Sequence, residues 1–132
     1  MYSFLVYVSG ECSKTKTIIQ IQGNKKLSDL ADAICASKLS DIIDELNDDS
    51  HLYGFTDNLK SFWRDSKSGI KYTKQPDNEM QEFRHMFFCI KTDREVAASK
   101  INISGKFNLV GKKMLFAYDF GTTTNFIIRR IS

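Results

Sequence analysis

The carboxylate of Asp119 lies inside the aromatic stretch "MLFAYDFG", residues 114–121, where two kinds of chemistry are open to it. It could act as a general base or bind a ligand together with His51, if the two segments meet in space. It could instead accept backbone N–H bonds ahead of Gly121 and hold the end of a strand in shape. We favour the turn role, because one histidine with carboxylates distant in sequence does not define a catalytic site.

The other residue types that carry chemistry lie too far apart to form a recognisable site. The spacing of the two histidines and three cysteines fits neither a zinc site nor a disulfide framework (His51, His85, Cys12, Cys35 and Cys89). The chain has no G-x-S-x-G elbow and no glycine-rich phosphate loop. The sequence therefore predicts no metal, no cofactor and no catalytic residue that a motif identifies.

A basic and aromatic segment offers a different function. Lys60, Trp63, Arg64 and Lys67 surround Phe62, and such mixtures occur in proteins that bind single-stranded nucleic acid. The alternative is that the aromatic rings pack in the core beside a solvated basic loop, which is the commoner fate of such residues. Both interpretations stay open, and we favour core packing.

Composition is that of one ordinary globular domain spanning residues 1–132. The chain is 42% hydrophobic, 12% aromatic and 27% charged, with a net charge of +3. This charge permits an anionic partner but falls short of a dedicated nucleic-acid domain. The odd, scattered cysteines fit a reducing cytoplasm, and neither a transmembrane span nor a signal peptide is recognisable. We expect a cytoplasmic protein without a membrane partner.

Hydrophobic periodicity predicts the elements that must position these side chains. Alternating residues at 2–9 and 15–22 indicate a β-hairpin, and the spacing then changes to that of a helix from Leu27 to Ala36, capped by Ser28 or Asp29. A second short helix is expected at 40–47 and a short strand at 51–55. Residues 83–90 favour a strand, and residues 100–113 favour short extended pieces.

The last two segments predict a second hairpin, formed by residues 114–120 and 125–131. We expect the first strand to lie beside these segments, because both carry apolar residues on two faces and need cover. Buried positions are expected at Phe4, Leu30, Ile34 and Phe116. The fold class is therefore α+β, with a helix packed on a mostly antiparallel or mixed sheet between two hairpins.

Two stretches of the chain resemble the plasmid pRiA4b open-reading-frame-three-like family, also called MM3350-like. A D-D-x-H-L-x-x-F segment after the helix and a Y-x-Y-D-F-G segment in the last hairpin are matched by Asp48, Asp49, His51, Leu52, Phe55, Phe116, Tyr118, Asp119, Phe120 and Gly121. The family usually continues the second segment with acidic residues, a tryptophan and a histidine, whereas this chain continues with "TTTN" and Phe126.

The resemblance implies an α+β fold and a cytoplasmic bacterial or archaeal protein linked to plasmids or insertion elements, with no established reaction. We therefore expect a non-enzymatic binding module that contacts an unknown protein or ligand through His51, Tyr53, Tyr118 and Asp119. One alternative is a weak nucleic-acid binder that uses the basic and aromatic segment. A second alternative is a hydrolase-like enzyme that uses His51 with Asp119. The oligomeric state is left open.

Overall fold

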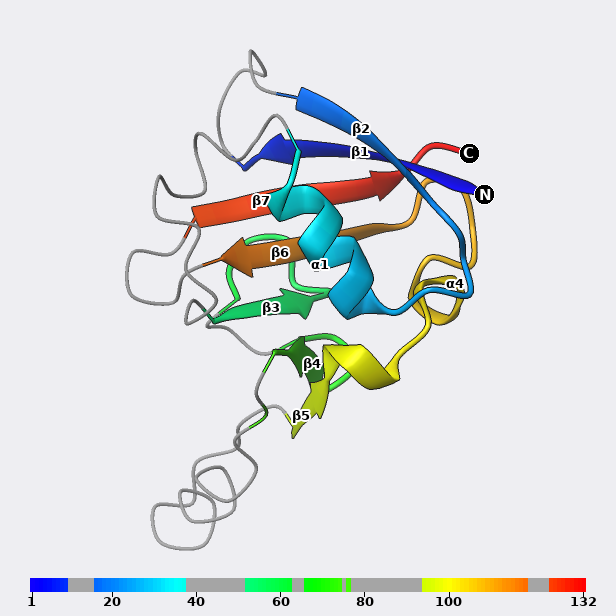
Figure 1. Ribbon diagram of the computed structural model, residues 1–132. Helices are drawn as coiled ribbons and strands as arrows, with labels where there is room; N and C mark the ends of the chain where they lie inside the picture. The colour runs from blue at the N-terminus through cyan, green and yellow to red at the C-terminus, as the bar shows by residue number, and fades with distance from the viewer. Residues whose placement is uncertain (10–15, 38–51, 63–65, 75, 77–93, 119–123) are drawn as a thin grey trace, which may run out of the picture.

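The computed structural model of the chain describes residues 1–9, 16–37, 52–62, 66–74, 76, 94–118 and 124–132 (Figure 1). Its elements follow in the order β1 (Tyr2–Val8), β2 (Lys16–Ile21), α1 (Leu27–Cys35), β3 (Tyr53–Thr56), β4 (Ile70–Thr73), β5 (Arg94–Ala97), the 3-10 turn η1 (Ala98–Lys100), α4 (Ile103–Lys106), β6 (Lys113–Tyr118) and β7 (Thr124–Arg130). The strands form one sheet in the order β2-β1-β7-β6-β3-β4-β5. The α+β fold class is confirmed.

Both predicted hairpins are present. β1 pairs with β2, and β6 pairs with β7, each antiparallel. β1 also pairs with β7, so the first strand lies beside the last as expected. The sheet is mixed because β4 and β5 are parallel, and the sequence does not predict these two short strands.

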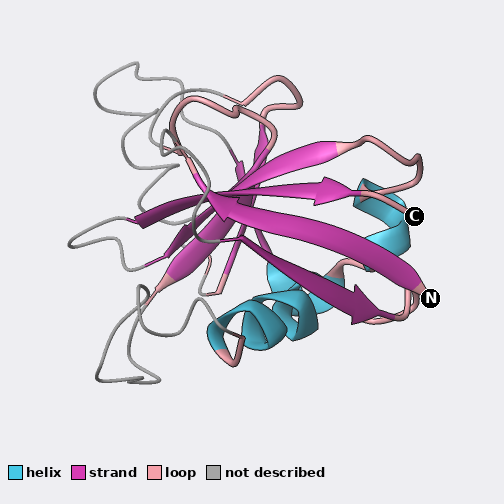
Figure 2. Ribbon diagram, turned by 90° about the horizontal axis from the view of Figure 1, so that it is seen from above, coloured by secondary structure: helices cyan, strands magenta, loops and turns pink. Residues whose placement is uncertain are grey.

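Side chains of the strands alternate between two faces of the sheet, as strand geometry requires. The face under α1 holds the larger hydrophobic core, and it includes the four positions expected to be buried, Phe4, Leu30, Ile34 and Phe116. Figure 2 shows α1 lying along this face. On the opposite face a smaller cluster joins Phe62, Leu115, Ala117 and Ile127, with Tyr7 packed against it.

The start of α1 differs from the prediction that Ser28 or Asp29 caps it. The N-cap is Lys26, and the Asp29 carboxylate accepts the Lys26 N–H at 2.9 Å from inside the first turn. The reason is tertiary pairing: the Leu27 N–H donates to the Ile101 carbonyl at 2.9 Å. A distant main-chain partner therefore fixes where the helix begins.

Residues 98–106 also differ from the extended pieces expected there. They form η1 and the single turn α4, in which Ile103 is buried and is followed by the buried Phe107. This spacing of four residues puts both side chains on the same side of a helical turn. After it, Gly111 adopts φ +94 and donates its N–H to the Arg130 carbonyl at 2.7 Å. The helix expected at 40–47 and the strand expected at 83–90 lie outside the described residues.

Candidate functional site

The two segments that carry the family resemblance meet in the sheet as neighbouring strands. β3 and β6 pair antiparallel, with Phe55 opposite Phe116 and Tyr53 opposite Tyr118. His51 and Asp119, the remaining candidate contacts, lie outside the described residues. The register therefore brings the described ends of both segments together, and the proposed contact between His51 and Asp119 stays a prediction.

Tyr53 and Tyr118 have side chains on the covered face and are only 6% and 5% exposed. Burial raises the pKa of the Tyr53 phenol to about 12, and the negative charge of Asp32 adds to the increase. Burial likewise raises the pKa of the nearby Cys35 thiol to about 11. Both groups keep their protons at neutral pH, so neither is activated as a base or nucleophile.

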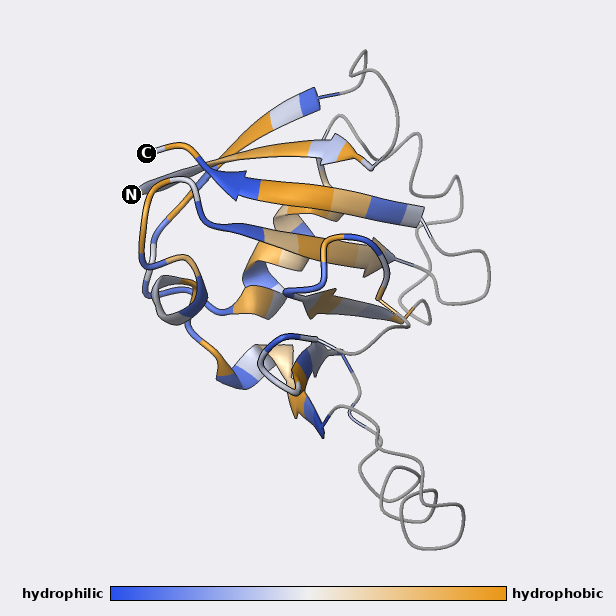
Figure 3. Ribbon diagram, turned by 180° about the vertical axis from the view of Figure 1, so that it is seen from behind, coloured by the Kyte–Doolittle hydropathy of each residue, from blue (hydrophilic) through white to orange (hydrophobic). Residues whose placement is uncertain are grey.

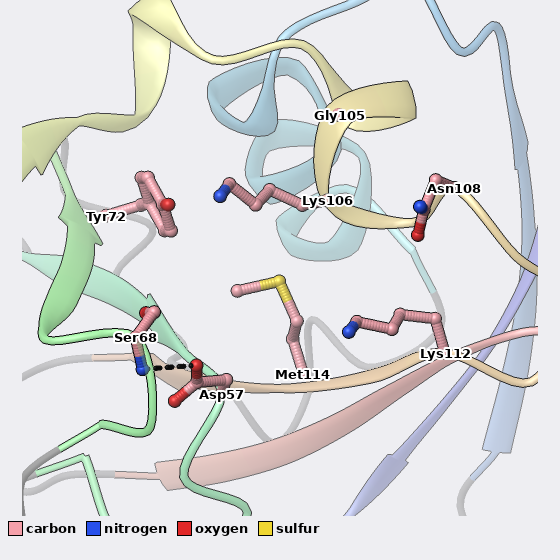
Figure 4. A pocket seen from close by; sticks show the side chains of 8 residues that line it. All are labelled: Asp57, Ser68, Tyr72, Gly105, Lys106, Asn108, Lys112 and Met114. Carbon is pink, nitrogen blue, oxygen red and sulfur yellow. Dashed lines mark hydrogen bonds between the residues drawn. The ribbon is translucent and has the colours of Figure 1, made fainter.

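A pocket of about 240 Å³ opens beside α4. Figure 4 shows the eight residues that line it, which come from α4, β4, β6 and the segments next to them: Asp57, Ser68, Tyr72, Gly105, Lys106, Asn108, Lys112 and Met114. Segments far apart in the sequence thus converge on one site. Tyr72 and Met114 supply its apolar surface, and both belong to the core under α1.

Two lysines dominate the charge of this pocket. The Lys106 ammonium lies 4.8 Å from the centre of the Tyr72 ring, in the geometry of a cation–π contact. The Lys112 side chain points into the same space, with the Met114 side chain between the two lysines (Figure 4). Asp57 is the single acidic residue in the lining. Two positive charges and one negative charge give the lining a formal charge of +1, which suits an anionic group.

The Asp57 carboxylate also holds the neighbouring loop in place. Its two oxygens accept the backbone N–H groups of Lys67 at 2.6 Å and Ser68 at 3.0 Å. Gly69 follows with φ +74, and its carbonyl accepts the Arg94 N–H at 3.0 Å, where β4 and β5 begin. Asp57 therefore fixes the wall of the pocket that Ser68 contributes.

Sequence reasoning missed this pocket entirely. The lysines lie in "SGKFNLVGKK", residues 104–113, a stretch for which the sequence predicts short extended pieces. A hint was present in the two glycines flanked by lysines, since glycine allows turns that bring side chains together. Asp57 and Tyr72, which complete the site, have no sequence signal that links them to this stretch.

The basic and aromatic segment is only partly described. Lys60 and Lys67 are exposed, and Trp63 and Arg64 lie outside the described residues. Phe62 is only 3% exposed, and the Lys71 ammonium lies 4.8 Å from the centre of its ring. The Phe62 ring therefore packs in the smaller cluster, as the core-packing interpretation expected for it.

In the described ranges no cluster of three histidine, cysteine or acidic side chains could hold a metal ion. None of the helices described there is long and apolar enough to cross a membrane.

Comparisons with known proteins show the fold. Neither a scan against models of protein families nor a search of curated proteins finds a match. Among solved structures, the chain is similar to the crystal structure of MM3350 from Methanosarcina mazei Go1, a protein of unknown function, with a TM-score of 0.62 and 24% sequence identity. The match covers 99% of this chain and 58% of that chain. It supports an MM3350-like fold and does not bear on the pRiA4b name.

Proposed function

We propose that this protein is a non-enzymatic binding module whose pocket beside α4 accepts an anionic group. The observation that carries the proposal is the pair Lys106 and Lys112, which point into one pocket over Tyr72 and Met114 (Figure 4). A carboxylate or phosphate group gains charge-assisted hydrogen bonds from two ammonium groups there. The Met114 and Tyr72 side chains would cover an apolar part of the same ligand.

The size of the pocket limits what it can hold. Pockets for drug-sized ligands measure roughly 300 to 1,000 Å³. At about 240 Å³, this one suits a small acid or the anionic end of a larger molecule. Inorganic phosphate and succinate are therefore suitable first probes, because they present the anionic group with little else attached.

The ionisable groups of the covered face favour binding over catalysis. Tyr53 and Cys35 hold their protons at neutral pH, and both oxygens of Asp57 accept backbone hydrogen bonds. We therefore rank binding above the hydrolase-like use of His51 with Asp119. Contacts of His51, Tyr53, Tyr118 or Asp119 with a partner, the cytoplasmic location and the link to plasmids or mobile elements stay predictions.

Isothermal titration of the full chain with phosphate and with succinate tests the proposal. We expect Lys106→Gln and Lys112→Gln each to weaken binding about tenfold, because each removes one ammonium group from the lining. Lys100→Gln is the matched control, since Lys100 is exposed at the end of η1 and does not line the pocket. Equal losses in all three variants, or no binding of either probe to the wild type, would overturn the pocket as an anion site.

A further inference from the structure

The sheet face opposite α1 carries a row of cationic and apolar side chains across four strands. Lys113 on β6 lies opposite Arg129 on β7, Arg129 lies opposite Leu5 on β1, and Leu5 lies opposite Ile18 on β2. Residues that are directly opposite in antiparallel strands place their side chains on the same face. Lys113 and Arg129 are exposed, and Ile18 is 61% exposed. Figure 3 views the molecule from this side, with α1 behind the sheet.

A second row runs parallel to the first, two residues further along β1. Tyr7 lies opposite Lys16 on β2 and opposite Ile127 on β7. Ile127 belongs to the smaller cluster, against which Tyr7 is half-buried, while Lys16 is exposed. We use the name open face for the side chains of Leu5, Tyr7, Lys16, Ile18, Lys113 and Arg129.

The open face is positively charged and has no acidic residue of its own. Lys16, Lys113 and Arg129 contribute three positive charges, and β1, β2, β6 and β7 contain no aspartate or glutamate. Lys113 and Arg129 are also direct cross-strand neighbours, an arrangement of like charges that destabilises a sheet. An anion placed between them would remove that repulsion. The face therefore has the charge pattern of a surface that binds a polyanion.

The adjacent arginine serves as an internal comparison. Arg130 points to the other face, where its guanidinium lies 3.6 Å from the centre of the Tyr2 ring and donates to the Phe107 carbonyl at 2.9 Å. Arg130 thus contributes to the packing on the covered face of the sheet. Arg129 is exposed and makes no hydrogen bond or ion pair with the described part of the chain.

We propose that the open face binds single-stranded nucleic acid, with Lys16, Lys113 and Arg129 contacting phosphates and Tyr7 stacking on a base. Strands lie about 4.8 Å apart, so the row from Lys113 to Ile18 spans about 14 Å, enough for a few nucleotides. Leu5 and Ile18 give apolar contact to base faces. Phe62 packs on the same side of the sheet, two residues after the exposed Lys60.

Binding of a fluorescein-labelled fifteen-nucleotide oligo(dT) to the full chain, followed by anisotropy across salt concentrations, tests the proposal. Three phosphate contacts predict a slope of log K against log salt of about −2, since each contributes about −0.7 for single strands. The double variant Lys113→Gln/Arg129→Gln should flatten the slope to about −0.7 and weaken binding more than tenfold at low salt. Lys25→Gln/Lys100→Gln removes the same net charge from exposed positions outside the open face and should change affinity less than twofold.

If the two double variants lose the same oligo(dT) affinity, the loss reflects net charge alone and the proposal is wrong. Tyr7→Leu should weaken binding about fivefold while Tyr7→Phe keeps it, because only the aromatic ring stacks. If Tyr7→Leu binds like the wild type, or if a fifteen-base-pair duplex binds as tightly as oligo(dT), the single-strand assignment is wrong. Displacement of oligo(dT) by lower concentrations of polyglutamate would instead identify an acidic protein as the partner.

This inference does not depend on the anion pocket beside α4. Lys106→Gln and Lys112→Gln should leave oligo(dT) binding unchanged, and the open-face variants should leave phosphate binding unchanged. Loss of oligo(dT) binding in the Lys106→Gln variant would contradict the separation of the two sites and with it the assignment of the open face.

Discussion

The two faces of the sheet receive side chains from the same strands but differ in cover and charge. On β1, Phe4 and Val6 are fully buried under α1, whereas Leu5 and Tyr7 on the opposite face are half-buried. On β7, the same alternation sends Arg130 into contacts with Tyr2 and Phe107 and leaves Arg129 exposed. The covered face therefore accounts for most of the apolar burial, and the open face leaves basic and apolar side chains exposed.

Truncation of Phe116 should have the largest effect on this comparison. Its ring is fully buried and packs against Phe55 at 4.9 Å and Tyr53 at 5.6 Å between ring centres. We expect Phe116→Ala to lower the free energy of unfolding by about 3 to 5 kcal/mol. Ile18→Ala on the open face should change it by less than about 0.5 kcal/mol. Urea denaturation of both variants checks the prediction, and similar losses would contradict the assignment of the two faces.

Gly54 tests the smaller cluster on the opposite face. A Cβ atom at this position would lie 2.6 Å from Cζ of Phe62, so an alanine would overlap the buried ring. We expect Gly54→Ala to cost about 1 to 3 kcal/mol, the usual range for overpacking. Adding Phe62→Leu should recover part of that loss, because the smaller side chain makes room for the methyl group. A double variant that loses at least the sum of the two single losses would exclude the steric explanation.

The sequence predicted those elements in which a regular hydrophobic pattern repeats over many residues. β1, β2, α1, β6 and β7 each extend over at least six residues, and hydrophobic alternation or helical spacing identified all of them. β4, β5 and α4 have four residues each and were not predicted. β3 is equally short, but the turn residues on both sides of its alternating run indicated the strand expected at 51–55. Local sequence patterns also could not predict the pocket. The pocket beside α4 joins segments up to 57 residues apart, from Asp57 to Met114, and only the folded chain brings them together.

The cap of α1 shows a second reason for a wrong prediction. Ser28 and Asp29 are good capping residues by type, but pairing of residues 25–27 with 101–103 determines where the helix begins. A local stretch of sequence does not show which distant segment it will pair with. The candidate contacts Tyr53 and Tyr118 illustrate the same point, because the sequence shows their types and not their burial under α1.

Two ionisable side chains on the covered face, Cys35 and Tyr53, should make stability fall at alkaline pH. We expect this effect to be smaller than that of truncating Phe116. Folding raises the pKa of Cys35 from 9.0 to about 11 and that of Tyr53 from 10.0 to about 12. Both groups bind their protons more tightly when folded, so their contribution is fully present below pH 9 and is lost as pH rises through 11 and 12. At pH 10 only part of it is lost. The urea midpoint should fall less between pH 8 and pH 10 in Cys35→Ala and in Tyr53→Phe than in the wild type. An equal fall in the variants and the wild type would contradict the raised pKa values of the two groups.

Replacement of Asp57 by asparagine should lower stability slightly and strengthen anion binding. Asp57→Asn keeps one acceptor oxygen and loses the other, so one of the N–H groups of Lys67 and Ser68 loses its partner. Both N–H groups belong to exposed residues, and water can replace the bond, so we expect a loss of about 0.5 to 1.5 kcal/mol. The same change removes the only negative charge from a lining that contains Lys106 and Lys112.

Phosphate affinity should therefore rise about two- to fivefold in Asp57→Asn while the urea midpoint falls, since repulsion between the carboxylate and the anion is gone. Asp29→Asn is the matched control, because Asp29 also accepts a backbone N–H, from Lys26 at 2.9 Å, and does not line the pocket. Asp29→Asn should lose less stability than Asp57→Asn, because the remaining amide oxygen can still accept the single Lys26 N–H, and it should leave phosphate affinity unchanged. If phosphate binds Asp57→Asn more weakly than wild type, the carboxylate takes part in holding the ligand, and the pocket selects a group that also donates a hydrogen bond.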